Sequence, residues 1–294
     1  MMHGLLLIDK PEGITSAEVV RVVKRQLRCK TGHLGTLDPF ASGVLPVCIG
    51  EGTKIAQFLN TAEKEYTGRI RLGYETDSGD LTGSLTRSAP IPSCSAAELA
   101  DVARRFLGDS MQIPPMHSAI KCKGVPLYEL ARKGIAVERQ ARRVRIEALE
   151  LSADGSERIT FRVACSKGTY VRVLAQEIAT ALGSAGHLEA LRRVRFGAFR
   201  IEEAIVLDAV GPRLPELIGL RDALRHIREI AIDAPAAERA RQGYAPLLRS
   251  IPRGTRDEAV KLVDPSGALA SVIVMNEVGQ WQFARVFPAA QLLP

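Results

Sequence analysis

The sequence predicts an α+β protein with one larger domain and one smaller domain. Segments whose apolar residues alternate or run together predict strands, and they outnumber the amphipathic segments that predict helices. The helices are intermittent rather than strictly alternating with strands, which favours α+β over α/β. The chain has 294 residues, of which 46% are hydrophobic and 25% charged, so it can bury a sizeable core.

Three amphipathic stretches in the first 110 residues predict helices. Two begin with capping boxes, in which a hydroxyl and a carboxylate three residues later each satisfy an unpaired backbone amide. The boxes are Thr15 with Glu18 and Ser95 with Glu98, and the remaining helix covers residues 50–59. The other predictions, in chain order, are a strand at 5–8, a Gly- and Pro-rich loop from 32 to 44, an alternating half-buried strand at 65–73, and a polar loop at 74–92.

The middle of the chain predicts an excursion from the core at residues 112–143, because prolines and basic residues occur there without a settled period. After it come strands at 144–151 and 159–165, a helix that ends at Gly183, a short helix across 188–199, and an amphipathic, Arg-rich segment at 212–232.

The last 60 residues predict a compact all-β appendage that opens near Pro235. Three short segments predict strands at 260–263, 270–275 and 282–286, and the sequence DPSG at 264–267 predicts a turn between two of them. We therefore expect a larger domain at residues 1–232 and a smaller one at 233–294.

The charge and the reactive side chains limit the classes of function. The formal charge is +7, and three basic clusters without balancing acids favour phosphate contact, although any one of them would suit a solvated face. The clusters are Arg21, Lys24, Arg25, Arg28 and Lys30; Arg139, Arg142, Arg143 and Arg145; and Arg192, Arg193 and Arg195. The five cysteines and five histidines are scattered, so we expect reduced thiols and no metal site.

Targeting signals are not evident in the sequence. No run of 18 apolar residues is present, and the apolar residues 5–8 are too few for a signal peptide. We expect a cytoplasmic protein that does not enter the membrane.

A single carboxylate, Asp38, lies in the apolar stretch GTLDPFASGVLP. Asp before Pro often starts a turn, which would explain Asp38 without any chemistry. However, an acid among apolar residues is costly to bury without a partner. A loop fixed by prolines and glycines that presents one acid also suits a nucleophile or a base.

Six stretches, in this order, resemble the motifs of the TruB family of bacterial tRNA pseudouridine synthases. They are KPEGITS (10–16), GHLGTLDPFASGVLPVCIGEGTK (32–54), EYTGRIRLGYETDSGD (65–80), PPMHSAIKCKGVPLYELARKG (114–134), CSKGTYVRVLAQEIATALG (165–183) and LRRVRFGAF (191–199). The resemblance implies a mixed, largely antiparallel sheet domain of the pseudouridine synthase type, in which residues 112–143 are an RNA-gripping insertion.

The resemblance also implies an activity. The family isomerises uridine 55 in the T arm of tRNA: the base is flipped out, the glycosidic C–N bond is broken and a C–C bond is formed. No net redox change occurs, so we expect no cofactor. The implied partner is the T arm of tRNA, and we expect a monomer with no obligate protein partner.

The resemblance assigns roles to seven residues. Asp38 matches the catalytic aspartate, Arg172 the arginine that pairs with it, and Tyr66 the tyrosine that stacks on the flipped base. His33, Tyr170, Leu191 and Lys10 match residues that contact or support the substrate. Without the resemblance, these residues would have ordinary structural roles. Arg172 would be a surface helix residue, and Tyr66, Tyr170 and Leu191 would be core residues. His33 would be a loop histidine, and Lys10 would be a solvated lysine.

Two questions stay open at the level of sequence. Many members of this family end in a PUA-type β domain that touches RNA, and residues 233–294 suit either such a domain or a stabilising appendage. The chain could also be an RNA chaperone that opens the T arm without chemistry, or an unrelated enzyme that uses Asp38 on a small phosphorylated substrate. The lack of a P-loop, of a second nearby acid and of metal ligands disfavours the unrelated enzyme.

Overall fold

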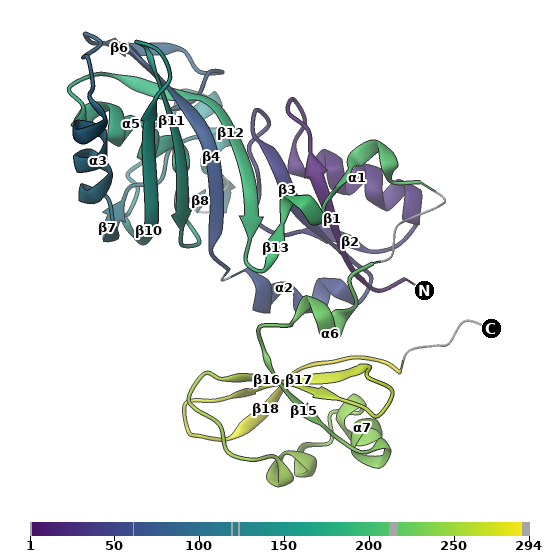
Figure 1. Cartoon of the computed structure of the whole chain (residues 1–294). Coiled ribbons are helices and arrows are strands. Elements are labelled where there is room, and N and C mark those ends of the chain that lie inside the picture. Colours follow the sequence, from purple (N-terminus) through teal and green to yellow (C-terminus); the bar gives the residue numbers. More distant parts are fainter. Residues whose placement is uncertain (1, 61, 119, 123, 212–216, 290–294) are drawn as a thin grey trace.

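The computed structural model describes residues 2–60, 62–118, 120–122, 124–211 and 217–289. A large sheet with flanking helices makes up most of the chain, and a smaller sheet formed by the C-terminal residues lies beside it (Figure 1). Among the described residues, no helix is both long enough and apolar enough to cross a membrane.

Ten strands of the described residues form the large sheet, in the order β14-β1-β3-β12-β4-β11-β10-β7, with β2 beside β3 and β13 beside β12. Their bounds are β1 (Gly4–Lys10), β2 (Thr31–His33), β3 (Ser42–Ile49), β4 (Lys64–Leu72), β7 (Gly108–Gln112), β10 (Arg142–Ala153), β11 (Arg158–Cys165), β12 (Gly186–Phe196), β13 (Phe199–Arg200) and β14 (Ile205–Val206). Only the β1–β14 and β3–β12 pairs are parallel. The sheet is therefore mixed and largely antiparallel, which confirms the predicted fold class.

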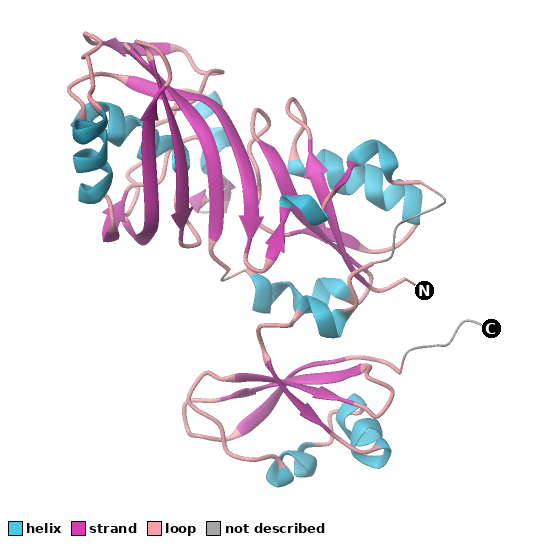
Figure 2. Cartoon of the chain, in the orientation of Figure 1, coloured by secondary structure: helices cyan, strands magenta, loops and turns pink. Residues whose placement is uncertain are grey.

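The four longer helices of the large domain lie against this sheet (Figure 2). They are α1 (Ser16–Leu27), α2 (Gly52–Leu59), α3 (Ala96–Arg105) and α5 (Val171–Ala181), with short 3-10 turns η1 (Ile201–Glu203) and η2 (Leu207–Ala209) after β13. Both capping boxes are present: the Thr15 and Ser95 hydroxyls accept from the amides of Glu18 and Glu98. Apolar side chains of α1, α3 and α5 join one core cluster with the sheet.

The helix predicted across residues 188–199 is wrong, because residues 188–196 belong to the central strand β12 and Phe199 begins β13. Strand β12 pairs with β4 along most of its length and with β3 on the other side. The register shifts between Leu188 and Ala190 and between Arg193 and Arg195. A bulge inserts one residue into the strand, so buried residues such as Leu188 and Leu191 are spaced by three rather than two. That spacing resembles a helical period in the sequence.

The polar loop predicted at 74–92 contains a hairpin of β5 (Tyr74–Thr76) and β6 (Leu85–Ser88). The excursion predicted at 112–143 leaves the sheet after β7 and returns at β10. It carries β8 (Lys121–Cys122), β9 (Val125–Pro126) and α4 (Leu127–Arg132). The excursion holds only short elements because its prolines, glycines and basic residues favour neither a long helix nor a long strand.

The smaller unit is a four-stranded sheet in the order β15-β16-β17-β18. Its strands are β15 (Arg228–Ala231), β16 (Ala259–Val263), β17 (Leu269–Met275) and β18 (Trp281–Val286). The last three are the predicted strands, and β15 lies just before the boundary expected after residue 232. Of the segment predicted at 212–232, residues 212–216 lie outside the described residues, and the rest also contains α6 (Leu220–Ala223).

The sequence predicted an all-β unit, but the smaller unit also contains helices. It contains α7 (Ala234–Arg241) and the 3-10 helix η3 (Ala245–Ser250). The Asp233 side chain caps α7, and Pro235 lies in its first turn, where a missing N–H costs nothing. Pro235 therefore starts a helix rather than a β unit.

Candidate active site

The loop between β2 and β3 carries Asp38 and is fixed from the start of α1. The Ser16 hydroxyl accepts from the amide of Leu37 (2.9 Å) and donates to the carbonyl of the same residue (3.0 Å). The amide of Gly13 donates to the carbonyl of Pro39 (2.8 Å). The residues on both sides of Asp38 are thus held by Ser16 of α1 and by Gly13 in the segment before α1, so the position of its carboxylate is set by the fold.

Lys10 supports the same loop from behind. Its side chain is fully buried, and its Nζ donates to the carbonyls of Pro11 (2.8 Å), Ile14 (2.7 Å) and Pro39 (3.2 Å). Burial lowers the pKa of Lys10 to about 8. Lys10 is therefore neither a solvated lysine nor part of the pocket lining described below, and its contacts are those of a residue that positions the loop.

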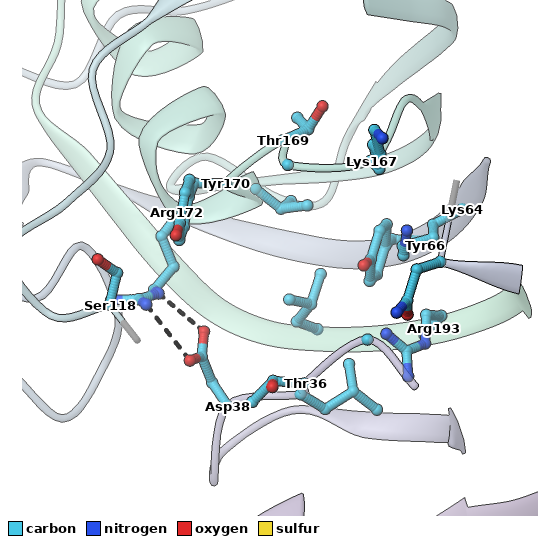
Figure 3. Close-up of a pocket in the computed structure, with 16 residues that line it drawn as sticks. Thr36, Asp38, Lys64, Tyr66, Ser118, Lys167, Thr169, Tyr170, Arg172 and Arg193 are labelled. Carbon is cyan, nitrogen blue, oxygen red and sulfur yellow. Dashed lines mark hydrogen bonds and ion pairs between the residues drawn. The ribbon is translucent and has the colours of Figure 1, made fainter. Parts of the chain in front are cut away.

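Asp38 and Arg172 meet although 134 positions separate them in the chain. Arg172 lies in the first turn of α5, and its Nε lies 2.8 Å from Asp38 Oδ2, while its Nη2 donates to Asp38 Oδ1 (3.3 Å) (Figure 3). Burial raises the pKa of the Asp38 carboxyl, and the positive charge of Arg172 opposes this effect. The guanidinium is the counter-ion that a lone acid in an apolar loop needs.

Arg172 also joins two further segments to this pair. Its side chain is only 4% exposed, and it donates to the carbonyls of Ser78 (2.8 Å) and His117 (2.7 Å). Ser78 lies between β5 and β6, and His117 lies in the 112–143 excursion. A planar guanidinium with five donors can satisfy these partners together, which an ammonium group cannot do with the same geometry.

Asp80 is a second carboxylate at this site that the sequence analysis missed. It is buried, and its Oδ2 lies 3.8 Å from Arg172 Nε. Its Oδ1 accepts from the Ser78 hydroxyl (2.8 Å) and from the Thr82 amide (2.9 Å) and hydroxyl (2.6 Å). Asp80 ends the quoted stretch EYTGRIRLGYETDSGD, and the turn-forming sequence DSGDLT was the available signal. Its negative charge adds to the rise in the pKa of Asp38.

A pocket of about 330 Å³ opens beside the Asp38–Arg172 pair, a volume typical of small-molecule sites. Tyr66 of β4, Leu191 of β12 and Tyr170, the residue before α5, line it as predicted. Tyr66 and Leu191 are buried, so they form an apolar wall that suits a flat aromatic ligand. The structure thus brings five of the seven predicted site residues together, because Asp38 and Arg172 also line this pocket.

His33, the remaining predicted residue, lies at the end of β2 and does not line this pocket among the described residues. It is half-buried, and its Nδ1 has no hydrogen-bond partner within the described part of the chain. Burial and the neighbouring charge of Arg193 lower the pKa of His33.

The other end of the pocket is lined by Lys64 and Arg193, which the sequence analysis did not assign to the site (Figure 3). Arg193 is fully buried and Lys64 is 8% exposed. The Nε of Arg193 donates to the carbonyl of Val44 (2.8 Å), and the Nζ of Lys64 donates to that of Ala62 (2.9 Å). Arg193 had been placed in a cluster of phosphate-binding arginines, and its burial contradicts that role.

In two of the three basic clusters an arginine pairs with an acid that is distant in the sequence, which the sequence did not indicate; in the third, Arg21 pairs only with its neighbour Glu18 (3.4 Å). Arg143 pairs with Asp109 (2.9 Å), and Arg192 pairs with Asp9 (2.7 Å). The cluster at the C-terminal end of α1 differs from these two. Four of its side chains are exposed and form no ion pair within the described residues: Lys24, Arg25, Arg28 and Lys30. This cluster is the most accessible basic surface of the three.

Comparison with known proteins agrees with the fold and the site. The model of the family "TruB family pseudouridylate synthase (N terminal domain)" matches residues 21–171. The chain is 44% identical over 249 residues to "tRNA pseudouridine synthase B" of Dechloromonas aromatica, and the matched region covers 82% of this chain and 83% of the relative. It is 50% identical over 212 residues to the protein of the same name from Psychrobacter cryohalolentis, covering 70% of this chain and 59% of the relative.

Solved structures show the same fold. A chain of an H/ACA ribonucleoprotein bound to a substrate RNA containing 2'-deoxyuridine matches with a TM-score of 0.73 at 24% identity, covering 99% of this chain and 87% of the other. A chain of a Cbf5-Nop10-Gar1 complex matches with a TM-score of 0.69 at 24% identity, covering 97% and 85%. The motifs, the family match and the similarity along most of the chain together show that the chain belongs to the TruB family of pseudouridylate synthases.

Proposed function

We propose that this chain isomerises uridine to pseudouridine at position 55 in the T arm of tRNA. The relatives named above are called tRNA pseudouridine synthases, which supports tRNA as the substrate. The observation that carries the proposal is the Asp38–Arg172 pair at the edge of a pocket with an aromatic wall. An acid beside a nucleobase-sized pocket suits chemistry on the base or on the sugar carbon attached to it.

The reaction moves atoms within one nucleotide. The bond between C1′ of the ribose and N1 of uracil breaks, the base turns, and C5 of uracil bonds to C1′. C5 then loses its hydrogen and N1 gains one, so the composition of the nucleotide does not change. The reaction therefore requires no oxidant, no reductant and no cofactor.

The base of a folded tRNA must leave its stack before it can enter such a pocket, at a cost of a few kcal/mol. We propose that Tyr66 stacks on the extruded uracil, with Leu191 and Tyr170 completing the walls of the pocket. Stacking of a base on an aromatic side chain contributes roughly 1–3 kcal/mol, enough to offset much of that cost. We propose that His33, at the end of β2 where the loop that carries Asp38 begins, contacts the displaced nucleotides.

Asp38 acts as the nucleophile or base at the ribosyl–uracil centre in this proposal, and Arg172 keeps it ionised and oriented. Lys10 positions the loop that carries Asp38, through its bond to the Pro39 carbonyl. Because Arg172 also binds the His117 carbonyl, the proposed RNA-gripping insertion at 112–143 is tied to the same guanidinium. RNA contacts made by the insertion would thus act directly on the geometry of the site.

The domain roles follow the same proposal. Residues 1–232 are the catalytic domain apart from β15, which pairs with β16, and residues 233–294 together with β15 are a PUA-like unit that contacts RNA. We propose that the chain acts in the cytoplasm. Because it supplies its own acid, arginine and basic surface, we also propose that it acts as a monomer without an obligate protein partner. Apolar residues of the C-terminal unit share a core cluster with the large domain, so the unit also stabilises the fold.

The proposal is tested by tritium release from tRNA that carries 5-tritiated uridine. Asp38→Asn keeps the size of the side chain but removes its charge, and we expect tritium release to be abolished while tRNA affinity and folding are retained. Asp101→Asn, at an exposed acid of α3, is the matched control and should release tritium like the wild type. Full activity of Asp38→Asn would remove Asp38 from the mechanism. A wild-type chain that binds tRNA without turnover would instead favour the RNA-chaperone alternative.

A further inference from the structure

Two buried cations at one end of the pocket have no anionic partner. Neither Lys64 nor Arg193 forms an ion pair with a carboxylate in the described part of the chain, although each is at least nine-tenths buried. The Nη1 and Nη2 atoms of Arg193 are buried and form no hydrogen bond of normal geometry among the described residues; the Tyr66 hydroxyl lies near enough to interact with this guanidinium, but burial raises the pKa of Tyr66, so the hydroxyl supplies no negative charge. A buried charge without a partner is expensive, so a folded protein keeps one only where something else compensates it.

The two cations lie close together. Both face the ring of Phe196, with Lys64 Nζ 4.9 Å and the Arg193 guanidinium carbon 5.3 Å from its centroid. A methyl group placed on Gly35 would approach Arg193 Nη1 to 3.1 Å and Lys64 Cε to 3.2 Å. Their mutual repulsion adds to the effect of burial, and together these lower the pKa of Lys64 to about 8. Phe196 offsets part of this cost, because an aromatic face attracts cations, but it carries no net charge.

The pocket is therefore electrically polarised. At one end, Asp38 and Asp80 surround Arg172, and at the other end the charge is positive and unpaired. Tyr66 lies on β4 two residues after Lys64 and pairs with Arg193 in the register of β4 and β12. A base stacked on Tyr66, as proposed above, would lie between the two ends.

We propose that Lys64 and Arg193 form an anion-stabilising pair for the uracil ring, which becomes negative when it is detached from the ribose. The inference rests on the proposed isomerisation. When the C1′–N1 bond breaks, its electron pair stays with uracil, and the negative charge spreads over N1 and the two ring oxygens. The electron deficiency at C1′ is met by the Asp38 carboxylate, and the charge on uracil is returned when C5 forms its bond to C1′.

Preorganised positive charge acts on such a ring without rearrangement during the reaction, and it is most effective where water is excluded. A guanidinium that solvent does not reach suits a field of this kind better than it suits direct contact with RNA phosphate. A phosphate is strongly hydrated and would have to enter the pocket with its oxygens exposed to Tyr66 and Leu191. Lys167, exposed at the mouth of the pocket, is better placed for a backbone phosphate.

The test begins with Lys64→Met, which keeps the length of the side chain and removes its charge. We expect the single-turnover rate of pseudouridine formation to fall roughly 100-fold, the size of effect seen when one stabilising group is removed from an anionic transition state. The affinity for tRNA should not change. Lys54→Met is the matched control, because Lys54 also lies over a phenylalanine ring and donates to a backbone carbonyl, but on α2 outside the pocket lining. It should leave the rate unchanged.

The pH dependence gives a second readout that a purely structural role would not move. Because the pKa of Lys64 is about 8, kcat/KM of the wild type should fall as the pH rises through that value. The charged or titratable groups that influence Lys64 are Arg193 of β12, Cys165 of β11 and Lys167, which precedes α5. Burial raises the pKa of Cys165 to about 11, so its titration lies above the window. Lys64→Arg should move this fall to higher pH, and Lys64→Met should abolish it.

A modified substrate shows whether Lys64 acts on the uracil ring or on a phosphate of the RNA backbone. With 5-fluorouridine at the target position, the fluorine helps the ring to carry negative charge, so cleavage should depend less on Lys64. The ratio of wild-type to Lys64→Met rates, measured by nucleoside analysis, should be smaller than with uridine. Arg193→Lys, which retains the charge, should be less impaired than Arg193→Met.

Three outcomes would overturn the inference. A wild-type rate in Lys64→Met removes the need for its charge. A fall in rate that is matched by an equal loss of tRNA affinity, with the same ratio for both substrates, assigns Lys64 to RNA phosphate. If Lys64→Met does not fold, and Lys64→Arg has the same pH profile as the wild type, then the role of Lys64 is packing. The activity of the wild type is measured before that of any variant. A wild-type chain that leaves the tRNA unmodified would overturn the proposed function itself.

Discussion

Arg172 is the residue on which the geometry of the site depends. Its guanidinium binds Asp38 and the carbonyls of Ser78 and His117, and Asp80 lies at ion-pair distance behind it. Arg172 is buried, whereas the Asp38 side chain is 35% exposed, so loss of this partner should cost less than the about 3–5 kcal/mol typical of a fully buried ion pair. The arrangement therefore fixes the acid and also penalises any conformation in which the acid moves away.

Asp80→Asn tests the electrostatic part of this arrangement. Burial raises the pKa of Asp38, Arg172 opposes the rise, and the negative charge of Asp80 adds to it. An ionised Asp38 is the proposed reactive form, so activity should be lost as the pH falls through this raised pKa. Without the charge of Asp80 the pKa of Asp38 should decrease, and the acid limb of the kcat/KM profile should move to lower pH. An acid limb that stays in place would contradict this coupling.

The raised pKa of Asp38 also has a consequence for stability. The folded state binds the Asp38 proton more tightly than the unfolded chain does. The contribution of Asp38 to stability therefore decreases as the pH rises from its ordinary value to the raised one. In that interval the fold becomes less stable while the proposed catalytic form becomes more populated.

Among the elements, β3 and β12 bring the two ends of the pocket together. They pair in parallel through only Arg192 with Ser42 and Arg193 with Gly43. Gly43 has a φ of +110°, and a methyl group there would lie 2.2 Å from the carbonyl oxygen of Arg193. Only glycine allows this approach, so Gly43 determines how closely the Asp38 loop lies to the Lys64–Arg193 end.

Gly43→Ala should therefore lower the free energy of unfolding by about 3 kcal/mol, the sum expected for steric overlap and backbone strain. Gly155→Ala is the control, because Gly155 also has a positive φ, of +74°, but a methyl group there meets nothing within 4 Å. It should cost about 1 kcal/mol. Urea unfolding of both variants measures the difference, and equal losses would show that strand spacing does not matter.

The elements also show how far sequence patterns reach. The capping boxes and alternating strands such as β4 were predicted correctly because their signals are local. The strand β12 was missed because its bulges mimic a helical spacing. The proposed anion-stabilising pair was missed for a different reason. Arg193 is the second arginine of the sequence RRVR, and only the tertiary fold shows that it is buried and lines the pocket while Arg192 pairs with Asp9.

At the scale of the whole molecule, one of the apolar clusters contains residues from both sheets. Leu5 and Leu224 of the large domain lie in the same cluster as Leu269, Val272 and Phe287 of the C-terminal unit. The size and strand content of the last 60 residues indicated a separate unit, but not this contact, because no local pattern reports which surfaces meet. The contact fixes the C-terminal unit on the molecule that carries the pocket.

The net charge of +7 predicts that tRNA binding depends strongly on salt. The logarithm of the association constant should fall linearly with the logarithm of salt concentration, because each neutralised phosphate releases counterions. If each contacts one phosphate, replacing Lys24, Arg25 and Lys30 by Gln should reduce the slope by about 2.7. Arg158→Gln, at an arginine already paired with Glu189, should change it little. A flat response of the wild type to salt would contradict the tRNA assignment.

The most direct test of the central claim is to map pseudouridine in total tRNA from cells that have or lack this protein, and from cells in which Asp38→Asn replaces it. We expect pseudouridine at position 55 with the wild type, and unmodified uridine there in the other two. Modification at position 55 that persists without the protein or with Asp38→Asn, or pseudouridine lost only elsewhere, would contradict the account.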